Sequence, residues 1–196
     1  MTKVNRREAI ATMTALTGAA ALTLTPHEIA RAARHRAETA GLPQVPQFFD
    51  DHEWQTLRLL VDIILPRDQR SGSATDAGVP QFIDFVMMDG GEDRRTAMRG
   101  GLAWLDTECR ERFDGKTFRE CTESERAAVL DDIAYPDRAP AHLSHGVRWF
   151  TSLRNFTASG FWSSKMGVDD LQYMGNTALP EWTGCPPEQL RKLGLD

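Results

Sequence analysis

Apolar residues at helical spacing are the feature that most constrains how this chain folds. Between residues 52 and 65 the apolar side chains recur every three or four positions, at Trp54, Leu57, Leu60, Val61 and Ile64. This spacing places them on one face of an α-helix, and Pro66 ends that helix because proline cannot continue it. No segment alternates apolar and polar residues over a useful length, as a half-buried strand would. The chain is therefore predicted to be all-α.

Four more main helices are expected, over residues 79–88, 93–113, 123–134 and 142–165. The helix over 123–134 follows a capping box, in which Thr122 caps the first turn and Glu125 bonds back to it. Inside the helix over 93–113, the pair Gly100-Gly101 lowers helix propensity and suggests close packing against a neighbour.

The chain is expected to consist of three parts. These are a signal peptide over residues 1–25, a polar tether and linker over 26–47, and a helical domain over 48–196. Residues 27–40 read as a polar helix, which suits a tether or a surface helix. Near the C-terminus, short helical pieces over 168–173 and 186–193 flank an irregular segment punctuated by glycine and proline.

The overall charge and hydropathy exclude two classes of partner. The net charge is −5, and no acidic or basic block occurs. Nucleic acid is therefore not expected as the main partner, because phosphate binding needs a clustered basic face. No apolar run reaches the roughly 18 residues that would suggest a membrane span. The five Trp and nine Phe either pack the core or, in part, line a partner surface.

The first 25 residues have the layout of an export signal. Lys3, Arg6 and Arg7 precede a weakly apolar stretch rich in Ala, Thr and Leu, as in a secretory leader. The consecutive Arg6-Arg7 indicates the twin-arginine pathway, although Ala9 stands where the usual signal has a large apolar residue. The chain is therefore expected to pass the twin-arginine translocon into the periplasm. That pathway carries folded proteins, usually because a cofactor has to be inserted before export.

The sequence shows no motif with which the chain would hold such a cofactor. It contains neither the G-x-G-x-x-G of a dinucleotide site nor the C-x-x-C-H of covalent haem. No cofactor-binding or catalytic residue is therefore assigned. His142 and His145 are three residues apart and share a helix face, but a metal site needs further ligands. A stand-alone periplasmic metal-dependent enzyme built on these two histidines is the alternative hypothesis. His52, beside acidic residues, is expected to be exposed.

The three cysteines are Cys109, Cys121 and Cys185. An odd number in an exported protein suggests a free thiol or an intermolecular bridge. No two have C-x-x-C spacing, but Cys109 and Cys121 are near enough in sequence to close a short loop between two helices. They are a possible intrachain disulfide in an oxidising compartment, and Cys185 would then be left over.

A series of small and aromatic residues distinguishes the C-terminal third: Thr157-x-Ser159-Gly160-Phe161-x-Ser163-Ser164, Gly167, Tyr173, Gly175-Asn176 and Glu181-Trp182-x-Gly184-Cys185-Pro186. An earlier block reads LVDIILPRD over residues 60–68 and AGVPQFID over 77–84. These residues resemble the gluconate 2-dehydrogenase subunit 3 family, the small subunits of bacterial flavin-dependent sugar dehydrogenases. The twin-arginine leader fits the same family, so the resemblance covers most of the chain.

The resemblance implies a non-catalytic subunit of an oxidoreductase complex. Its partner would be a large FAD-containing subunit of the glucose-methanol-choline oxidoreductase type, which lacks an export signal of its own. FAD would then be held by the partner, and a cytochrome c subunit would often take the electrons onward. The substrates of such complexes are sugars, sugar acids or glycosides, and glycosides are often oxidised at C3. A transient export chaperone, which leaves its client after translocation, is a further alternative.

The partner interface is expected in the C-terminal signature. Small residues permit close approach of backbones, and aromatic side chains act as anchors. The predicted interface residues are Ser159, Gly160, Phe161, Trp162, Tyr173, Asn176, Trp182 and Cys185. Two alternatives stay open: Trp182 either contacts the partner or fills the domain's own core, and Cys185 either bridges to the large subunit or is a buried free thiol.

Overall fold

The computed structural model describes residues 23–41, 45–173, 181 and 184–195, and these residues contain helices and no strand. The all-α prediction is therefore confirmed for this part of the chain. The helices are α2 (Pro26–Glu38), α3 (Asp51–Ile64), α4 (Val79–Asp89), α5 (Glu92–Arg112), α6 (Glu123–Ala134), the short 3₁₀ helix η1 (Ala141–Leu143), α7 (Ser144–Trp162), α8 (Lys165–Asp170) and α9 (Pro187–Lys192). The leader arginines Arg6 and Arg7, and the predicted interface residues Asn176 and Trp182, lie outside the described residues.

All five main helices predicted from the sequence are present, as α3 to α7. The last of them is shorter than expected, because it ends at Trp162 and α8 begins at Lys165. The break has a local cause. Ser164 caps α8 by accepting a hydrogen bond from the Gly167 backbone N–H at 2.9 Å, which starts a new helix three residues past the end of α7.

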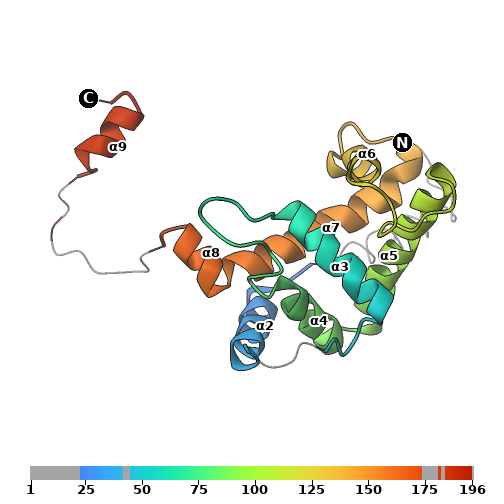
Figure 1. Cartoon of the computed structure of the whole chain (residues 1–196). Coiled ribbons are helices and arrows are strands. Elements are labelled where there is room, and N and C mark those ends of the chain that lie inside the picture. Colours follow the sequence, from blue (N-terminus) through green and yellow to red (C-terminus); the bar gives the residue numbers. More distant parts are fainter. Residues whose placement is uncertain (1–22, 42–44, 174–180, 182–183, 196) are drawn as a thin grey trace, which may run out of the picture.

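Helix α7 is the element around which the body packs. It contacts α2, α3, α4, α5, α6 and α8. Figure 1 shows it running through the body, with α5 and α6 near one end and α8 at the other. Its buried residues lie on several sides of the helix, which is what a helix with neighbours all around requires. They include Val147, Phe150, Leu153, Phe156 and Phe161.

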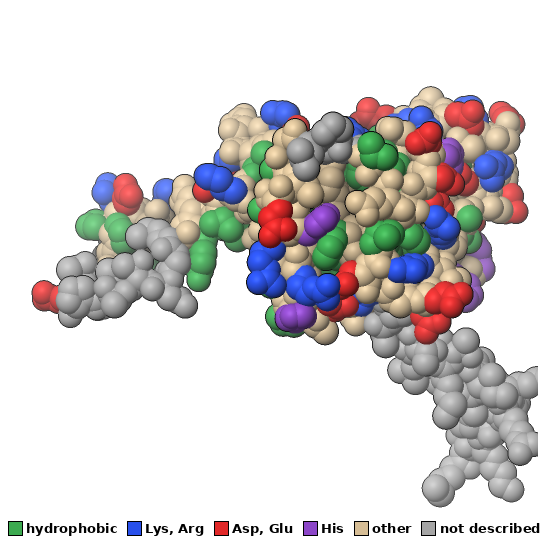
Figure 2. Space-filling view, turned by 90° about the horizontal axis from the view of Figure 1, so that it is seen from below, with side chains coloured by type: hydrophobic (Ala, Val, Ile, Leu, Met, Phe, Trp, Pro, Cys, Tyr) green, Lys and Arg blue, Asp and Glu red, His purple; other side chains and the backbone are tan. Residues whose placement is uncertain are grey.

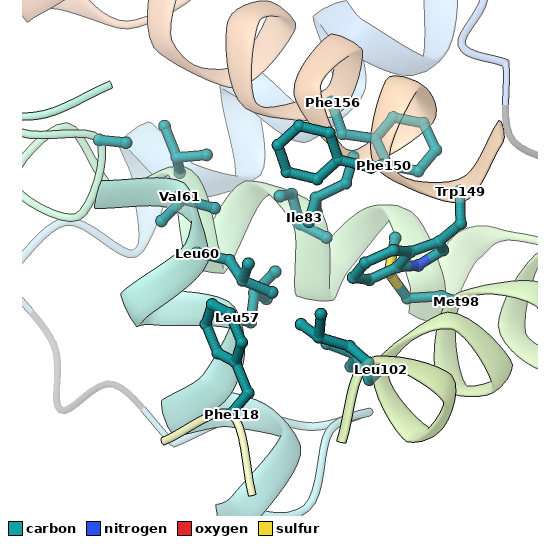
Figure 3. Packing of buried hydrophobic residues seen from close by; sticks show 14 of the residues in the cluster. Leu57, Leu60, Val61, Ile83, Met98, Leu102, Phe118, Trp149, Phe150 and Phe156 are labelled. Atoms are coloured by element: carbon teal, nitrogen blue, oxygen red, sulfur yellow. The ribbon is translucent and has the colours of Figure 1, made fainter. Parts of the chain in front are cut away.

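Two tryptophan–glycine pairs bring α5 and α7 together. Trp149 of α7 covers Gly101 of α5, where an added Cβ would lie 2.0 Å from the indole ring. Trp104 of α5 covers Gly146 of α7 in the same way, at 2.1 Å. Figure 3 shows Trp149 beside Met98 and Leu102 of α5. Each helix therefore packs one tryptophan ring on a glycine of the other. The close packing predicted at the Gly100-Gly101 pair is confirmed at Gly101.

Helix α2 packs on the body, although its polar sequence suggested a tether or surface helix. It contacts α4 and α7, Ala32 is fully buried, and the His35 ring stacks on Phe85 at 4.3 Å. Arg94 of α5 bonds the Glu28 carboxylate at 2.6 Å and the Thr23 carbonyl at 2.9 Å. Charged side chains make most of these contacts, which is why hydrophobic spacing did not reveal them.

The linker after α2 is held by a buried carboxylate. Asp84 of α4 accepts hydrogen bonds from the backbone N–H groups of Gln47, Phe48 and Phe49, at 2.9, 3.0 and 3.3 Å. These donors would otherwise lie unpaired at the start of α3, and the carboxylate satisfies all three. The entry of the chain into the helical domain is therefore fixed by α4.

Helix α9 differs from the others in that none of its residues is buried. Figure 1 shows it set apart from the packed body, beyond α8. Leu193 and Leu195, which follow it, are exposed. The packed body thus comprises α2 to α8, and α9 makes no contribution to its core.

Replacing Gly101 or Gly146 with alanine is expected to lower the free energy of unfolding by about 2–3 kcal/mol, because the new methyl group would overlap an indole ring held by a second helix. Gly100→Ala is the matched control. Nothing lies within 4 Å of a Cβ at Gly100, so this change should raise stability by about 0.5–1 kcal/mol through helix propensity. Denaturant unfolding of the three variants makes the comparison, and equal effects at Gly100 and Gly101 would contradict the close approach of α5 and α7.

The Glu28–Arg94 contact predicts a specific acid sensitivity. Burial raises the pKa of Glu28, but hydrogen bonds from the Thr25 backbone and from the Arg94 and Thr25 side chains outweigh it and lower the pKa to about 2. The folded pKa lies below the unfolded value, so the stabilisation is complete above about pH 5 and is lost as the pH falls toward 2. Glu28→Gln should cost about 1–3 kcal/mol at pH 7, and its difference from wild type should vanish near pH 2.

Glu38→Gln, an exposed change at the other end of α2, serves as the control. Urea unfolding measured from pH 7 to pH 2 separates the two variants. A Glu28→Gln difference that does not change with pH would show that the carboxylate is not held in its charged form by these contacts.

Candidate functional site

The predicted interface residues divide into buried and exposed groups at the end of α7. Gly160 and Phe161 are buried in the chain's own core, and a Cβ at Gly160 would lie 3.0 Å from Phe82 of α4. Gly160 therefore serves the packing of α4 on α7. Ser159 is half-buried. Among the described residues, the interface prediction consequently rests on Trp162, Tyr173 and Cys185, which are exposed.

A sharp corner between α7 and α8 explains two of the small residues in the signature. Ser164 donates a hydrogen bond to the carbonyl of Phe161 while it caps α8. A Cβ at Gly167 would lie 2.2 Å from that same carbonyl oxygen, so no larger residue fits there. Ser164 and Gly167 of the TASGF–SS–G pattern are therefore required by the turn of the chain, independently of any partner.

Arg36 of α2 completes this corner. Its guanidinium donates hydrogen bonds to the carbonyls of Gly160 at 2.6 Å and Ser163 at 2.9 Å. These carbonyls belong to the last turn of α7 and carry the negative end of its dipole. Burial lowers the pKa of Arg36. The contact ties α2 to the segment that carries the family signature, and the sequence alone did not suggest it.

The α7–α8 segment presents three large apolar side chains to solvent, one at the end of α7 and two just after α8. Trp162 is 39% exposed, Leu171 57% and Tyr173 61%. The Trp162 ring lies edge-on against buried Phe161, with ring centroids 5.6 Å apart, so its orientation is set by the core. Figure 2 shows hydrophobic side chains, in green, among the charged ones on the face of the body that is seen from below. We call Trp162, Leu171 and Tyr173 the corner patch.

A groove of about 880 Å³ lies beside the corner patch. It runs between α2, the loop from Arg70 to Gly78, and α8. Most charged side chains along it form ion pairs, Asp76 with Arg67, Arg70 with Asp170, and Lys165 with Asp169, while Arg36 bonds two backbone carbonyls. Its remaining lining consists largely of alanine, glycine and serine. Such a groove suits a segment of polypeptide better than a small charged ligand, which would need charges free to receive it.

A second polar cluster surrounds Asp106 of α5. The side chain is buried, and it lies 2.6 Å from His52 Nε2 through one oxygen while the other accepts the Phe118 backbone N–H at 2.9 Å. His52 is exposed, as expected, and lies at the mouth of a pocket of about 280 Å³. Nothing in the sequence linked it to Asp106, because the two are 54 positions apart.

A histidine–carboxylate pair can be part of a catalytic triad, so the nearby hydroxyls matter. Thr56 donates its hydroxyl hydrogen to the carbonyl of His52, and Thr107 donates to the carbonyl of Ala103. Neither hydroxyl is directed at the imidazole. Asp106 instead anchors Phe118, which is fully buried beside Leu57 in Figure 3. The cluster is therefore assigned a structural role.

Within the described residues, the histidine pair of the alternative hypothesis gains no further metal ligand. His142 lies in η1 and His145 in the first turn of α7, where its Nδ1 is 2.9 Å from Arg148 Nη2. Across the described part of the chain, no three His, Cys, Asp or Glu side chains group closely enough to hold a metal ion. No described helix is long and apolar enough to cross a membrane.

All three cysteines are free thiols in this structure. Cys109 and Cys121 are buried, while Cys185 is exposed. Of the two alternatives for Cys185, a buried free thiol therefore disagrees with the structure, and the bridge to a partner stays a prediction. The disulfide between Cys109 and Cys121 likewise stays a prediction.

Comparison with known proteins gives one match. Residues 51–180 match the profile of the family described as gluconate 2-dehydrogenase subunit 3. This range contains α3 to α8 and the whole corner patch, while α2 and α9 lie outside it. No curated protein and no solved structure matches the chain.

The structural role of Asp106 predicts unequal effects at the two members of the pair. Asp106→Ala leaves the Phe118 N–H without its acceptor in the core and should cost about 2–3 kcal/mol of unfolding free energy. His52→Ala removes an exposed partner and should cost less than about 1 kcal/mol. Asp106→Asn keeps an acceptor oxygen and should fall between them. Thermal or urea unfolding measures all three, and a loss at His52 as large as at Asp106 would contradict the assignment.

Proposed function

Because the chain belongs to the gluconate 2-dehydrogenase subunit 3 family, we propose that it is the non-catalytic small subunit of an exported FAD-dependent sugar or glycoside dehydrogenase. It binds a large flavoprotein of the glucose-methanol-choline oxidoreductase type in the cytoplasm. Through its twin-arginine leader it then carries that folded flavoprotein into the periplasm. A cytochrome c subunit completes the electron path in such an assembly.

The observation that carries this proposal is the corner patch. Trp162 is exposed where α7 ends, and Leu171 and Tyr173 are exposed just after α8, so three large apolar side chains are open to solvent inside the range that matches the family. Aromatic anchors of this kind are typical of interface hot spots. Helix α9 has no buried residue, so it adds nothing to the core of this chain, and we expect it to pack on the partner. Cys185, exposed just before α9, is in a position to bridge to the same partner.

FAD belongs to the partner in this proposal. The charged side chains of the groove beside the corner patch are engaged in ion pairs or, for Arg36, in bonds to backbone carbonyls, which supports placing the flavin on the partner. The role of this chain is to bind the flavoprotein, to hold it in its folded state, and to supply the export signal. The oxidation of the substrate takes place on the other subunit.

The test of the interface uses co-expression with a candidate large flavoprotein and measurement of the dissociation constant of the purified pair. Trp162→Ala combined with Tyr173→Ala should weaken binding at least about tenfold, because both side chains would lose apolar contact area. Tyr135→Ala is the matched control, since Tyr135 is equally exposed but follows α6, and it should leave binding unchanged. Equal affinities for all three proteins would remove the corner patch from the interface.

The export role has its own test. Changing Arg6 and Arg7 to lysine should leave the flavoprotein, with its FAD, in the cytoplasm, as seen by flavin fluorescence of cell fractions. A flavoprotein that reaches the periplasm without this chain would contradict the proposal. A flavoprotein that arrives with it and then separates would favour the transient chaperone, and the ratio of the two chains before and after export distinguishes these cases.

A further inference from the structure

The hairpin between α5 and α6 contains two buried thiols. Cys109 lies in the last turn of α5, and Cys121 directly precedes Thr122, the N-cap of α6. Their exposed fractions are 0% and 2%. The proposed role of the chain as an export subunit uses neither of them, and both belong to the hydrophobic core.

Backbone and side-chain bonds bring the two cysteines together. Asp106 Oδ1 accepts the Phe118 N–H at 2.9 Å, so α5 and the returning segment are joined at that point. Cys109 follows Asp106 by three residues and Cys121 follows Phe118 by three. Both intervals are helical turns, since Cys121 N–H bonds the Thr117 carbonyl at 3.1 Å. One turn beyond the Asp106–Phe118 bond, the two thiols therefore face each other.

The contact between the two thiols is one of the causes that shift their pKa values. Burial, followed by interaction with Cys121, raises the pKa of Cys109 to about 12. Burial and the Glu125 charge raise the pKa of Cys121, and they outweigh the contact with Cys109 and the charges of Lys116 and Arg126, which lower it. Both thiols are therefore protonated at neutral pH in the folded chain. A protonated, buried thiol reacts slowly, because the thiolate is the nucleophile.

We propose that Cys109 and Cys121 form an intrachain disulfide once the folded chain enters an oxidising compartment, and that this bond locks the α5–α6 hairpin. The oxidant is a disulfide donor, either a small-molecule disulfide or a thiol oxidase with a reactive disulfide. Cys121 loses its proton, attacks one donor sulfur and displaces one donor thiol. Cys109 then attacks the mixed disulfide and displaces the second. Two protein thiols are oxidised, and one donor disulfide is reduced to two thiols.

Cys121 is the entry point because it lies just before the N-cap of α6, in the segment that can open, whereas Cys109 lies within α5. Reaching it requires the segment between Phe113 and Cys121 to open locally. Lys116 holds that segment to Glu125 at 2.7 Å, and Arg126 bonds the carbonyls of Phe118 and Arg119 at 3.0 and 2.9 Å. Oxidation is therefore slow in the closed fold, and its rate reports the opening of this hairpin.

The test in solution uses the full chain with Cys185→Ser, which removes the exposed thiol, treated with oxidised glutathione at neutral pH. Mass spectrometry should show the loss of two hydrogens, and a thiol reagent in denaturant should find no free thiol. The bond closes a loop of about a dozen residues, so the Tm of the oxidised chain should exceed that of the reduced chain by about 5–10 °C. Cys109→Ala and Cys121→Ala in the same background should show neither change.

Two outcomes would overturn the pairing. One is a chain that stays reduced under conditions in which glutathione modifies the single-cysteine variants. The other is an oxidised chain with a lower Tm than the reduced one. Folding of the alanine variants is checked by circular dichroism, and if either fails to fold, the Tm difference between reduced and oxidised Cys185→Ser decides alone.

The timing of oxidation rests on the proposed export. A second experiment, in cells, therefore distinguishes a failure of export from a failure of the disulfide. Cells are quenched with an alkylating reagent, and the thiols of the chain are counted in each compartment. The periplasmic chain should lack free thiols at Cys109 and Cys121, while the chain retained by the Arg6→Lys and Arg7→Lys changes should keep both. A leader variant that still leaves the cytoplasm contradicts export, whereas a periplasmic chain with both thiols free contradicts the disulfide.

Discussion

The close approach of α5 and α7 is the constraint on which the rest of the structure depends. Two indoles lie over two glycines in a reciprocal pair, Trp149 on Gly101 and Trp104 on Gly146. This contact sets the position of α7, and α7 in turn contacts α2, α3, α4, α6 and α8. Glycine is the one residue that fits beneath each ring. The two glycines therefore determine how closely α5 and α7, the two longest of the described helices, approach each other.

The far end of α7 links this core to the proposed function. There the chain turns sharply into α8, held by Ser164, by the lack of a side chain at Gly167, and by the bonds of Arg36 to two α7 carbonyls. Trp162 is exposed at this turn, and Leu171 and Tyr173 are exposed at the other end of α8. Much of what reads as a family signature is therefore needed to build the corner, and a smaller set of exposed side chains remains for a partner.

The helices could be predicted from the sequence because their apolar spacing is a local property, as in α3 and in the capping box of Thr122 before α6. The glycine pair also indicated close packing. What could not be predicted are bonds between distant polar residues, such as Asp106 with Phe118 or Arg36 with Gly160. Such contacts leave no periodic pattern, and for that reason α2 was assigned to a tether. The division of the signature into buried and exposed residues likewise depends on the α7–α8 corner.

The central claim is that this chain acts by binding and exporting another protein that holds FAD. Native mass spectrometry of the tagged full chain, recovered from the periplasm of its own cells, tests this directly. The account predicts a complex with one larger polypeptide that carries a flavin, and no redox turnover by the small chain after the two are separated. A chain recovered alone, with a redox centre or sugar-oxidising activity of its own, would contradict the account.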